Sequence, residues 1–344
     1  MHTKIIYNEN FFFTRILQSR KEIIDELILN KESSYSVISI PKKSGLRQLS
    51  CIDKNNLLYT LQKNLTNNFL NFIPLSNNAF GFVKGYSYQS FLEPHINTGK
   101  SNRYFLRLDI NNFFGSIKAD LIRNVFSYYV KTDKKELNEE IVNCIVELTT
   151  LNGILPQGAI TSPVISNIVF RQLDIRIQEY CYKLDAIYSR YADDLLFSSN
   201  NNKLLENFFT GSISKIINSK GFTINYPKTK RGIGEVSLNG FVVGSNLRIS
   251  RKKKEDISKI LYVLSKGGKP LNVQEYLDRS NSQTYNSIEN TFSSANELIN
   301  YLCGYRAFLI QWLPKEQSNN KYKKIKNLIN RIQDVVIDIE NVRI

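Results

Sequence analysis

Residues 188–200 read YSRYADDLLFSSN, and no other stretch limits the possible folds of the chain so strongly. Apolar residues lead up to two adjacent aspartates, Asp193 and Asp194, and resume directly after them. The pattern predicts a strand, a tight turn and a second strand. Neighbouring carboxylates repel each other, and apolar flanks make them harder to solvate. An exposed turn is the simple interpretation, because Asp is common in turns. A site that supplies cations to both carboxylates is the functional one.

A third aspartate, Asp109, ends the apolar stretch RYFLRLD, which is typical of a strand. If this strand lies beside the hairpin in one antiparallel sheet, the three carboxylates converge. Two divalent cations about 3.5–4 Å apart would relieve the repulsion, activate a sugar hydroxyl and stabilise a phosphate leaving group. This chemistry is phosphoryl transfer, which depends mainly on positioning and charge stabilisation.

The residue inventory limits the kind of metal. The chain of 344 residues has two histidines, His2 and His95, which leaves little room for a histidine-built metal site or a histidine-dependent nucleophile. Its four cysteines are far apart and form no CxxC pair, which disfavours a zinc ribbon and fits a reducing, cytoplasmic compartment. Oxygen ligands remain, and they favour Mg²⁺, with Mn²⁺ as the alternative.

The charge balance indicates a polyanionic partner. Lys and Arg number 46 against 31 Asp and Glu, and the formal net charge is +15. Such an excess favours nucleic acid over a merely solvated surface. No apolar run approaches the roughly 20 residues that a membrane helix needs, so we expect no membrane partner.

Five segments, in a fixed order, resemble the motifs of the reverse transcriptases, and most of all those of the bacterial retron type. They are LRLDINNFF, LPQGAITSPVISN, RYADDLLFSS, GFTINYPKTKR and LNGFVVG, and the resemblance covers roughly residues 36–250. It implies an α+β right-hand polymerase fold, in which the palm is an antiparallel sheet backed by helices and the C-terminal thumb is helical. The implied parts are an N-terminal helical extension over 1–35, interleaved fingers and palm over 36–248, and a basic, RNA-binding thumb over 249–344.

The resemblance also implies roles for individual residues in catalysis. Asp109 and Asp193 would bind both metal ions, which are expected to be magnesium. Asp194 would be the adjacent catalytic carboxylate, and the backbone carbonyl of Ile110 would reach a metal. The implied activity is RNA-directed DNA polymerisation by a two-metal mechanism.

Other residues are implied in nucleotide binding. Phe114 stands five positions after Asp109, where the family places a ring that clashes with a ribose 2′-OH; a core aromatic is the alternative. Gln157 and Gly158 would contact the incoming nucleotide and the template base. Lys228 would donate a proton to pyrophosphate or offset its charge. The finger residues that would reach the triphosphate are Lys42, Lys43 and Arg47.

RNA contacts are implied in two regions. The basic runs of the thumb would neutralise phosphates through Arg251, Lys252, Lys253, Lys254, Lys323 and Lys324. Two retron motifs would contribute His95, Asn239 and Gly240. The chain departs from both motifs, because Phe91 and Leu92 stand where Asn and Ala are expected. In the second motif, Leu238 and Asn239 replace Val and Thr.

A retron enzyme would copy a dedicated structured non-coding RNA, which serves as template and primer, into a branched or linked single-stranded DNA. Its partners would be that RNA, the DNA product, dNTPs and an effector protein of an antiphage defence system. Two alternatives stay open at this point. One is a defence-associated enzyme with protein-primed or weakly templated DNA synthesis, and the other is a non-catalytic RNA-binding scaffold.

Overall fold

The computed structural model describes residues 4–42, 45–97, 99, 103–282, 291–313 and 320–342. Lys43, one of the predicted triphosphate contacts, lies outside the described residues, and so does the side chain of Lys42. The chain divides into two compact units. The first comprises 1–236 and 243–246, and the second comprises 237–242 and 247–344.

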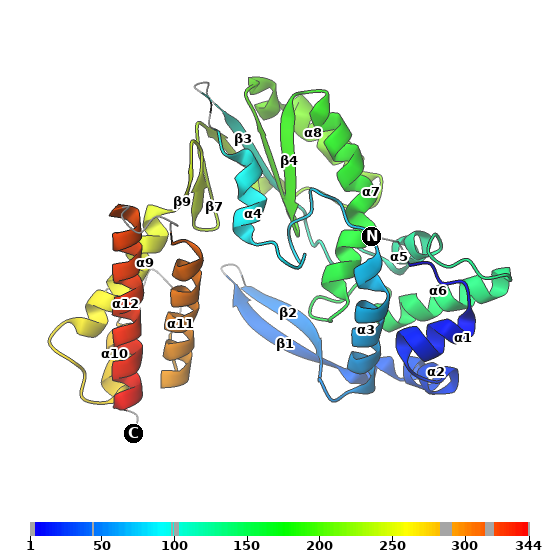
Figure 1. The fold of residues 1–344 in the computed structure, drawn as a ribbon, viewed down its shortest axis with the longest axis horizontal. Coiled ribbons are helices and arrows are strands. Elements are labelled where there is room, and N and C mark those ends of the chain that lie inside the picture. The colour runs from blue at the N-terminus through cyan, green and yellow to red at the C-terminus, as the bar shows by residue number, and fades with distance from the viewer. Residues whose placement is uncertain are drawn as a thin grey trace. The chain divides into compact units, whose positions relative to one another are not determined.

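A four-stranded antiparallel sheet organises the first unit (Figure 1). Its strands are ordered β4 (Ala186–Tyr191), β5 (Asp194–Ser199), β3 (Tyr104–Asp109) and β6 (Lys230–Ile233). Every residue of β5 is buried. This explains why its sequence is a run of mainly apolar and small residues, since a strand covered on both faces need not alternate.

Helices cover both faces of this sheet (Figure 1). Tyr188 and Arg190 of β4 hydrogen-bond Asp174 on the long helix α7 (Ser162–Tyr182). The intervening Ser189 donates to the carbonyl of Phe91 on α4 (Tyr88–Leu92). Because side chains alternate along a strand, α7 and α4 lie on opposite faces. Helix α8 (Asn207–Asn218) packs against α7.

A long hairpin joins the rest of the first unit through its base. Strands β1 (Tyr35–Lys42) and β2 (Gly45–Ile52) pair along their full length. The Ser50 amide donates to the Gln157 carbonyl at 2.8 Å. A Cβ on Gly158 would lie 2.8 Å from the Ser50 carbonyl oxygen. The hairpin base is therefore fitted closely to the Gln157–Gly158 backbone.

The N-terminal residues are helical and belong to the core of the first unit. They form α1 (Glu9–Phe11), the π-helix η1 (Phe12–Leu17) and α2 (Lys21–Leu29). Phe12, Ile16 and Ile24 are fully or almost fully buried within the same hydrophobic cluster as the sheet. The remaining helices of this unit are η2 (Lys31–Ser34), α3 (Leu57–Asn68), η3 (Leu70–Phe72), η4 (Glu93–His95), α5 (Ala119–Phe126), α6 (Lys135–Thr149), η5 (Asn202–Leu205) and η6 (Tyr226–Lys228).

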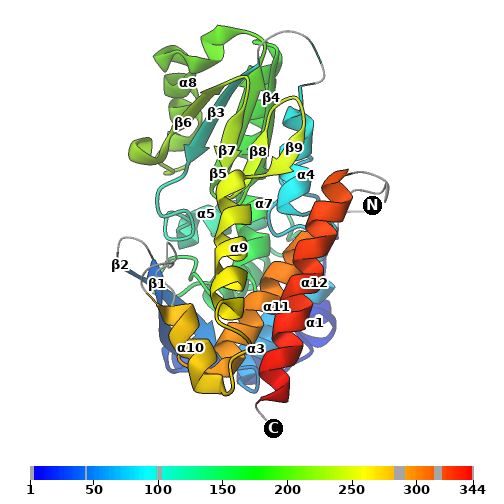
Figure 2. The ribbon, with the colours of Figure 1, turned by 90° about the vertical axis from the view of Figure 1, so that its left-hand side faces the viewer.

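Three short strands, β7 (Val236–Leu238), β8 (Phe241–Val243) and β9 (Leu247–Ile249), form a sheet where the chain passes from one unit to the other. The second unit is otherwise helical, and Figure 2 shows α9, α11 and α12 side by side. Its core contains Ile257, Leu298 and Ile332. The helices are α9 (Arg251–Ser265), α10 (Val273–Asn281), α11 (Ala295–Gln311) and α12 (Asn320–Asn341).

The predicted α+β class is confirmed, with an antiparallel sheet, covering helices and a helical C-terminal part. Among the described helices, none combines the length and apolarity that crossing a lipid bilayer requires.

Candidate active site

Three carboxylates meet at one end of the four-stranded sheet. The register of β3 and β5 places Asp109 directly opposite Asp194. Asp193 sits in the tight turn between β4 and β5, and its carbonyl accepts a hydrogen bond of 2.9 Å from the Ile110 amide. The turn is sharp because Ala192 adopts a left-handed conformation with φ of 56°. Two segments far apart in sequence are thus fixed side by side by backbone pairing.

Cationic side chains already contact these carboxylates. Arg107 lies two residues before Asp109 on the same face of β3, and its Nη2 is 3.3 Å from Asp109 Oδ1. The same Nη2 forms an ion pair with Asp194 Oδ1. Lys228 Nζ lies 3.2 Å from Asp109 Oδ2. The site therefore attracts positive charge from two different elements.

Burial sets the electrostatics of the site. Asp109 and Asp194 are only 3% and 6% exposed. Burial raises the pKa of Asp194 to about 6, although the Arg107 charge opposes the shift. Burial also raises the pKa of Asp193, and the negative charge of Asp109 adds to that shift. Protein cations alone do not fully compensate Asp193 and Asp194.

The donor set fits a metal ion with oxygen ligands. Within the described ranges, no group of three or more His, Cys, Asp or Glu side chains is already arranged around a metal position. However, one nitrogen of Arg107 contacts both Asp109 and Asp194, so a single cation at that point reaches two carboxylates. Carboxylate oxygens are the ligands that Mg²⁺ and Mn²⁺ prefer.

The predicted nucleotide residues other than Lys228 lie on other elements of the first unit. The ring of Phe114 is half-buried, with its centroid 6.0 Å from that of Phe82 and 5.5 Å from that of Phe113. Arg47 is exposed and pairs with Ile40. Since it lies four residues before Cys51, it shares the face of the hairpin whose Cys51 sulfur approaches Gly158. Gln157 is half-buried.

The prediction that His95 contacts RNA needs correction, because the ring is fully buried. Its Nδ1 and Nε2 each lie 2.7 Å from a hydroxyl oxygen, of Ser198 and Ser189 respectively. Ser189 donates its own proton to a carbonyl and Ser198 accepts from Arg103 Nε. The pattern fits a neutral ring that donates through Nε2. Burial lowers the pKa of His95 to about 3, and the Arg103 charge adds to the shift.

Three of the four departures from the two retron motifs are buried packing residues. Phe91 and Leu92 are fully buried, and the Phe91 ring lies 5.9 Å from that of Tyr191, the last residue of β4. Leu238 is also buried. Asn239 is exposed at the β7–β8 turn, where it has φ of 48°. The amide side chain that the first motif expects at Phe91 would be costly in such apolar surroundings.

The predicted thumb cations separate into two groups. Lys253 is half-buried, and its Nζ lies 4.3 Å from the ring centroid of Phe308, within cation–π range of Phe241 and Tyr305 as well. A Cβ on Gly240 would lie 2.4 Å from Lys253 Cδ. The Lys253 ammonium group is therefore held against aromatic rings of its own unit, which the prediction of a phosphate contact does not include. The exposed cations of the set are Arg251, Lys252, Lys254, Lys323 and Lys324.

Several residues of the site were not predictable from local sequence. The sequence pattern predicts an ordinary solvent-facing strand residue at Arg107. Its contact with Asp194 follows only from the register of β3 against β5. The buried pair of Asp174 and Arg190 joins residues 16 positions apart, on a helix and a strand. Gly81 lies so close to the turn between β4 and β5 that a Cβ would lie 2.5 Å from the Ala192 amide nitrogen. Each depends on tertiary pairing.

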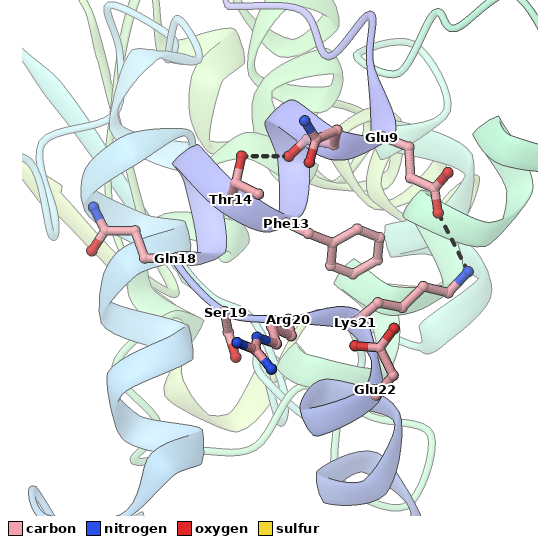
Figure 3. Close-up of a pocket in the computed structure, with 9 residues that line it drawn as sticks. Glu9, Phe13, Thr14, Gln18, Ser19, Arg20, Lys21 and Glu22 are labelled. Atoms are coloured by element: carbon pink, nitrogen blue, oxygen red, sulfur yellow. Dashed lines mark hydrogen bonds and ion pairs between the residues drawn. The ribbon is translucent and has the colours of Figure 1, made fainter.

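A separate cavity of about 610 Å³ lies over the N-terminal helices (Figure 3). Phe13, Thr14 and Arg20 line it, and Lys21 pairs with Glu9 at 3.3 Å on its wall. It contains none of the predicted catalytic residues.

Comparison with known proteins identifies the family. The family model described as "Reverse transcriptase (RNA-dependent DNA polymerase)" matches residues 40–262. The chain belongs to this family.

Its relatives include several retron enzymes. It is 31% identical over 240 residues to the Retron Ec73 reverse transcriptase of Escherichia coli, covering 66% of this chain and 74% of the relative. The Retron Ec86 enzyme of the same organism is 28% identical over 243 residues, covering 69% and 72%. The Retron Mx65 enzyme of Myxococcus xanthus is 29% identical over 242 residues, and the match covers 66% of this chain but only 55% of that relative, about half its length.

Proposed function

We propose that the chain is an RNA-directed DNA polymerase that copies a dedicated structured RNA into single-stranded DNA. The observation that carries this proposal is the pairing of Asp109 with Asp194 across β3 and β5, with Asp193 in the adjacent turn. One nitrogen of Arg107 contacts both paired carboxylates, so they lie close enough to share a cation. The match of residues 40–262 to the reverse transcriptase family supports RNA as the template and DNA as the product.

The residues divide the work of nucleotide addition. Asp109, Asp193 and Asp194 would hold two magnesium ions, with the Ile110 carbonyl nearby. Such ions, when bound, activate the attacking hydroxyl and stabilise the charge on the phosphates. Arg107 would leave the position that it shares with the two carboxylates, since a cation and a guanidinium repel each other there. The bound metal ions, instead of Arg107, would then neutralise the charge of the carboxylates.

Nucleotide selection would come from the surrounding elements. Arg47 on the hairpin face near Gly158 would bind triphosphate oxygens, for which a guanidinium is well suited. Lys228 keeps its side chain 58% exposed while contacting Asp109, so it can turn toward pyrophosphate. Phe114 would exclude a ribose 2′-OH, because its ring is braced by Phe82 and Phe113.

The retron assignment is supported by the relatives. The proposed template is a structured non-coding RNA that also provides the primer, and the product is DNA branched from or linked to that RNA. The exposed cations of α9 and α12 would bind its phosphates. We place an effector protein of a defence system as the further partner. The same proposal includes the assignment of residues 1–35 to an N-terminal extension, of 36–248 to the fingers and palm, and of 249–344 to the thumb.

Sequencing of the nucleic acid that co-purifies with the protein tests the proposal. We expect one abundant RNA species carrying DNA that survives protein digestion and remains attached after denaturation. DNA released by protease treatment would instead indicate protein priming. RNA without any DNA, unchanged in an Asp193→Asn/Asp194→Asn variant, would indicate a scaffold.

A further inference from the structure

A buried arginine lies behind the catalytic turn. Arg190 is fully buried in β4, two residues before Ala192. Its Nε and Nη2 donate to the two oxygens of Asp174 on α7, each at 2.8 Å. The guanidinium carbon lies 4.6 Å from the ring centroid of Phe170. Tyr188 donates to the same carboxylate at 2.7 Å. The bidentate contact with Asp174 and the ring of Phe170 therefore fix the orientation of the guanidinium.

The remaining nitrogen of Arg190 points along the strand to the turn. Nη1 donates to the Ala192 carbonyl at 3.2 Å and to Asn167 Oδ1 at 3.0 Å. Ala192 has φ of 56°, a conformation that is unfavourable for a residue with a Cβ unless its surroundings hold it. Its carbonyl directly precedes the Asp193 amide. A donor at this point therefore acts on the peptide that orients both aspartates.

The opposite side of the turn is also confined. Gly81 packs so closely that a Cβ there would lie 2.5 Å from the Ala192 nitrogen. Asn167 donates to the Gly81 carbonyl at 2.8 Å. The Phe80 amide donates to the Arg190 carbonyl at 2.8 Å. One amide side chain, Asn167, thus connects both walls of the turn.

We propose that Arg190 is a positioning residue for catalysis, which holds the Ala192 peptide in the conformation that aims Asp193 and Asp194. Asp174 and Asn167 orient the guanidinium for this role. The inference rests on the proposed polymerase function. A buried ion pair is by itself weak evidence of stabilisation, because apolar residues of similar volume often serve equally well. What an apolar replacement cannot supply is the hydrogen bond to Ala192.

The test separates positioning from stability with an apolar replacement of the whole cluster. Arg190→Met leaves the Asp174 carboxylate buried without its cationic partner, so the melting temperature of this variant should fall strongly. The triple variant Tyr188→Phe/Asp174→Leu/Arg190→Met removes the polar groups together, and most of that loss should be regained. DNA synthesis on a primed RNA template with Mg²⁺ gives kcat and the KM for dNTP. We expect kcat to stay at least tenfold below wild type in both variants, with KM within about threefold.

Two controls complete the design. Ile24→Ala removes buried apolar atoms from α2, far in sequence from the site, and should lower the melting temperature while kcat stays near the wild-type value. Gly81→Ala leaves the ion pair intact but pushes on the Ala192 peptide, and should lower kcat as Arg190→Met does.

Recovery of kcat in the triple variant, in step with its melting temperature, would overturn the inference and leave the polymerase proposal standing. So would an equal loss of kcat in Ile24→Ala. A wild-type protein that makes no DNA would overturn the proposed function and this inference with it.

Discussion

Neutralising Asp194 should stabilise the metal-free protein while abolishing its activity. The pKa of this carboxyl is raised from 3.8 to about 6, with burial as the first cause. This rise in the pKa corresponds to about 3 kcal/mol, since a tenfold change in proton affinity is worth about 1.4 kcal/mol. Because the folded state binds the proton more tightly than the unfolded state, the ionised group destabilises the fold above pH 6. This penalty decreases as the pH falls from about 6 toward 3.8.

Chemical denaturation of wild type and Asp194→Asn in EDTA measures the effect. At pH 7.5 we expect the variant to be more stable by up to about 3 kcal/mol. The two proteins should converge near pH 4. Added Mg²⁺ should stabilise the wild type and not the variant. Asp120→Asn, whose side chain is 88% exposed, is the matched control and should change stability by less than about 0.5 kcal/mol. A less stable Asp194→Asn protein at pH 7.5 would refute this electrostatic account of the site.

Further predictions concern residues whose roles the structure redefines or narrows. Phe114→Ala should increase ribonucleotide incorporation, and Phe82→Ala should do so to a smaller extent by loosening the ring, as competition between dNTP and rNTP in primer extension would show. Because the pKa of His95 is lowered to about 3, its neutral form stabilises the fold above about pH 6.5, and this stability is lost as the pH falls toward 3. Between pH 7 and pH 5, the free energy of unfolding of His95→Gln should therefore fall by about 2 kcal/mol less than that of wild type. An equal fall in both proteins would contradict a buried, neutral His95. Lys252→Ala should lower the slope of log affinity against log salt for RNA by about 0.7–0.9, whereas Lys253→Met should leave the slope unchanged and lower the melting temperature.

Local sequence pattern indicates the strands of the site and the acids that they carry. Asp109 follows an apolar strand, and Asp193 and Asp194 interrupt another apolar stretch, so their convergence is expected once the two segments share a sheet. The structure pairs Asp109 with Asp194 in that sheet. Their metal-binding roles remain predictions.

What the sequence could not supply is the identity of long-range partners. Arg107 follows the same alternation as any strand residue, and its contacts depend on the register of β3 against β5. His95 resembles a polar motif residue until the hydroxyls of β4 and β5 are found around it. Lys253 belongs to a basic run, yet it is enclosed by rings from α11 and β8. In each case tertiary packing overrides what composition indicates.

The most direct measurement is single-turnover extension of a primer on an RNA template, with Mg²⁺ and dNTPs, by wild type and by Asp109→Asn. We expect the variant to bind the RNA with an affinity within about threefold of wild type and to extend the primer at least a hundredfold more slowly, on the order of the loss seen when a charge-stabilising catalytic group is removed. Extension at the wild-type rate by the variant would contradict the central claim that these paired carboxylates carry out nucleotide addition.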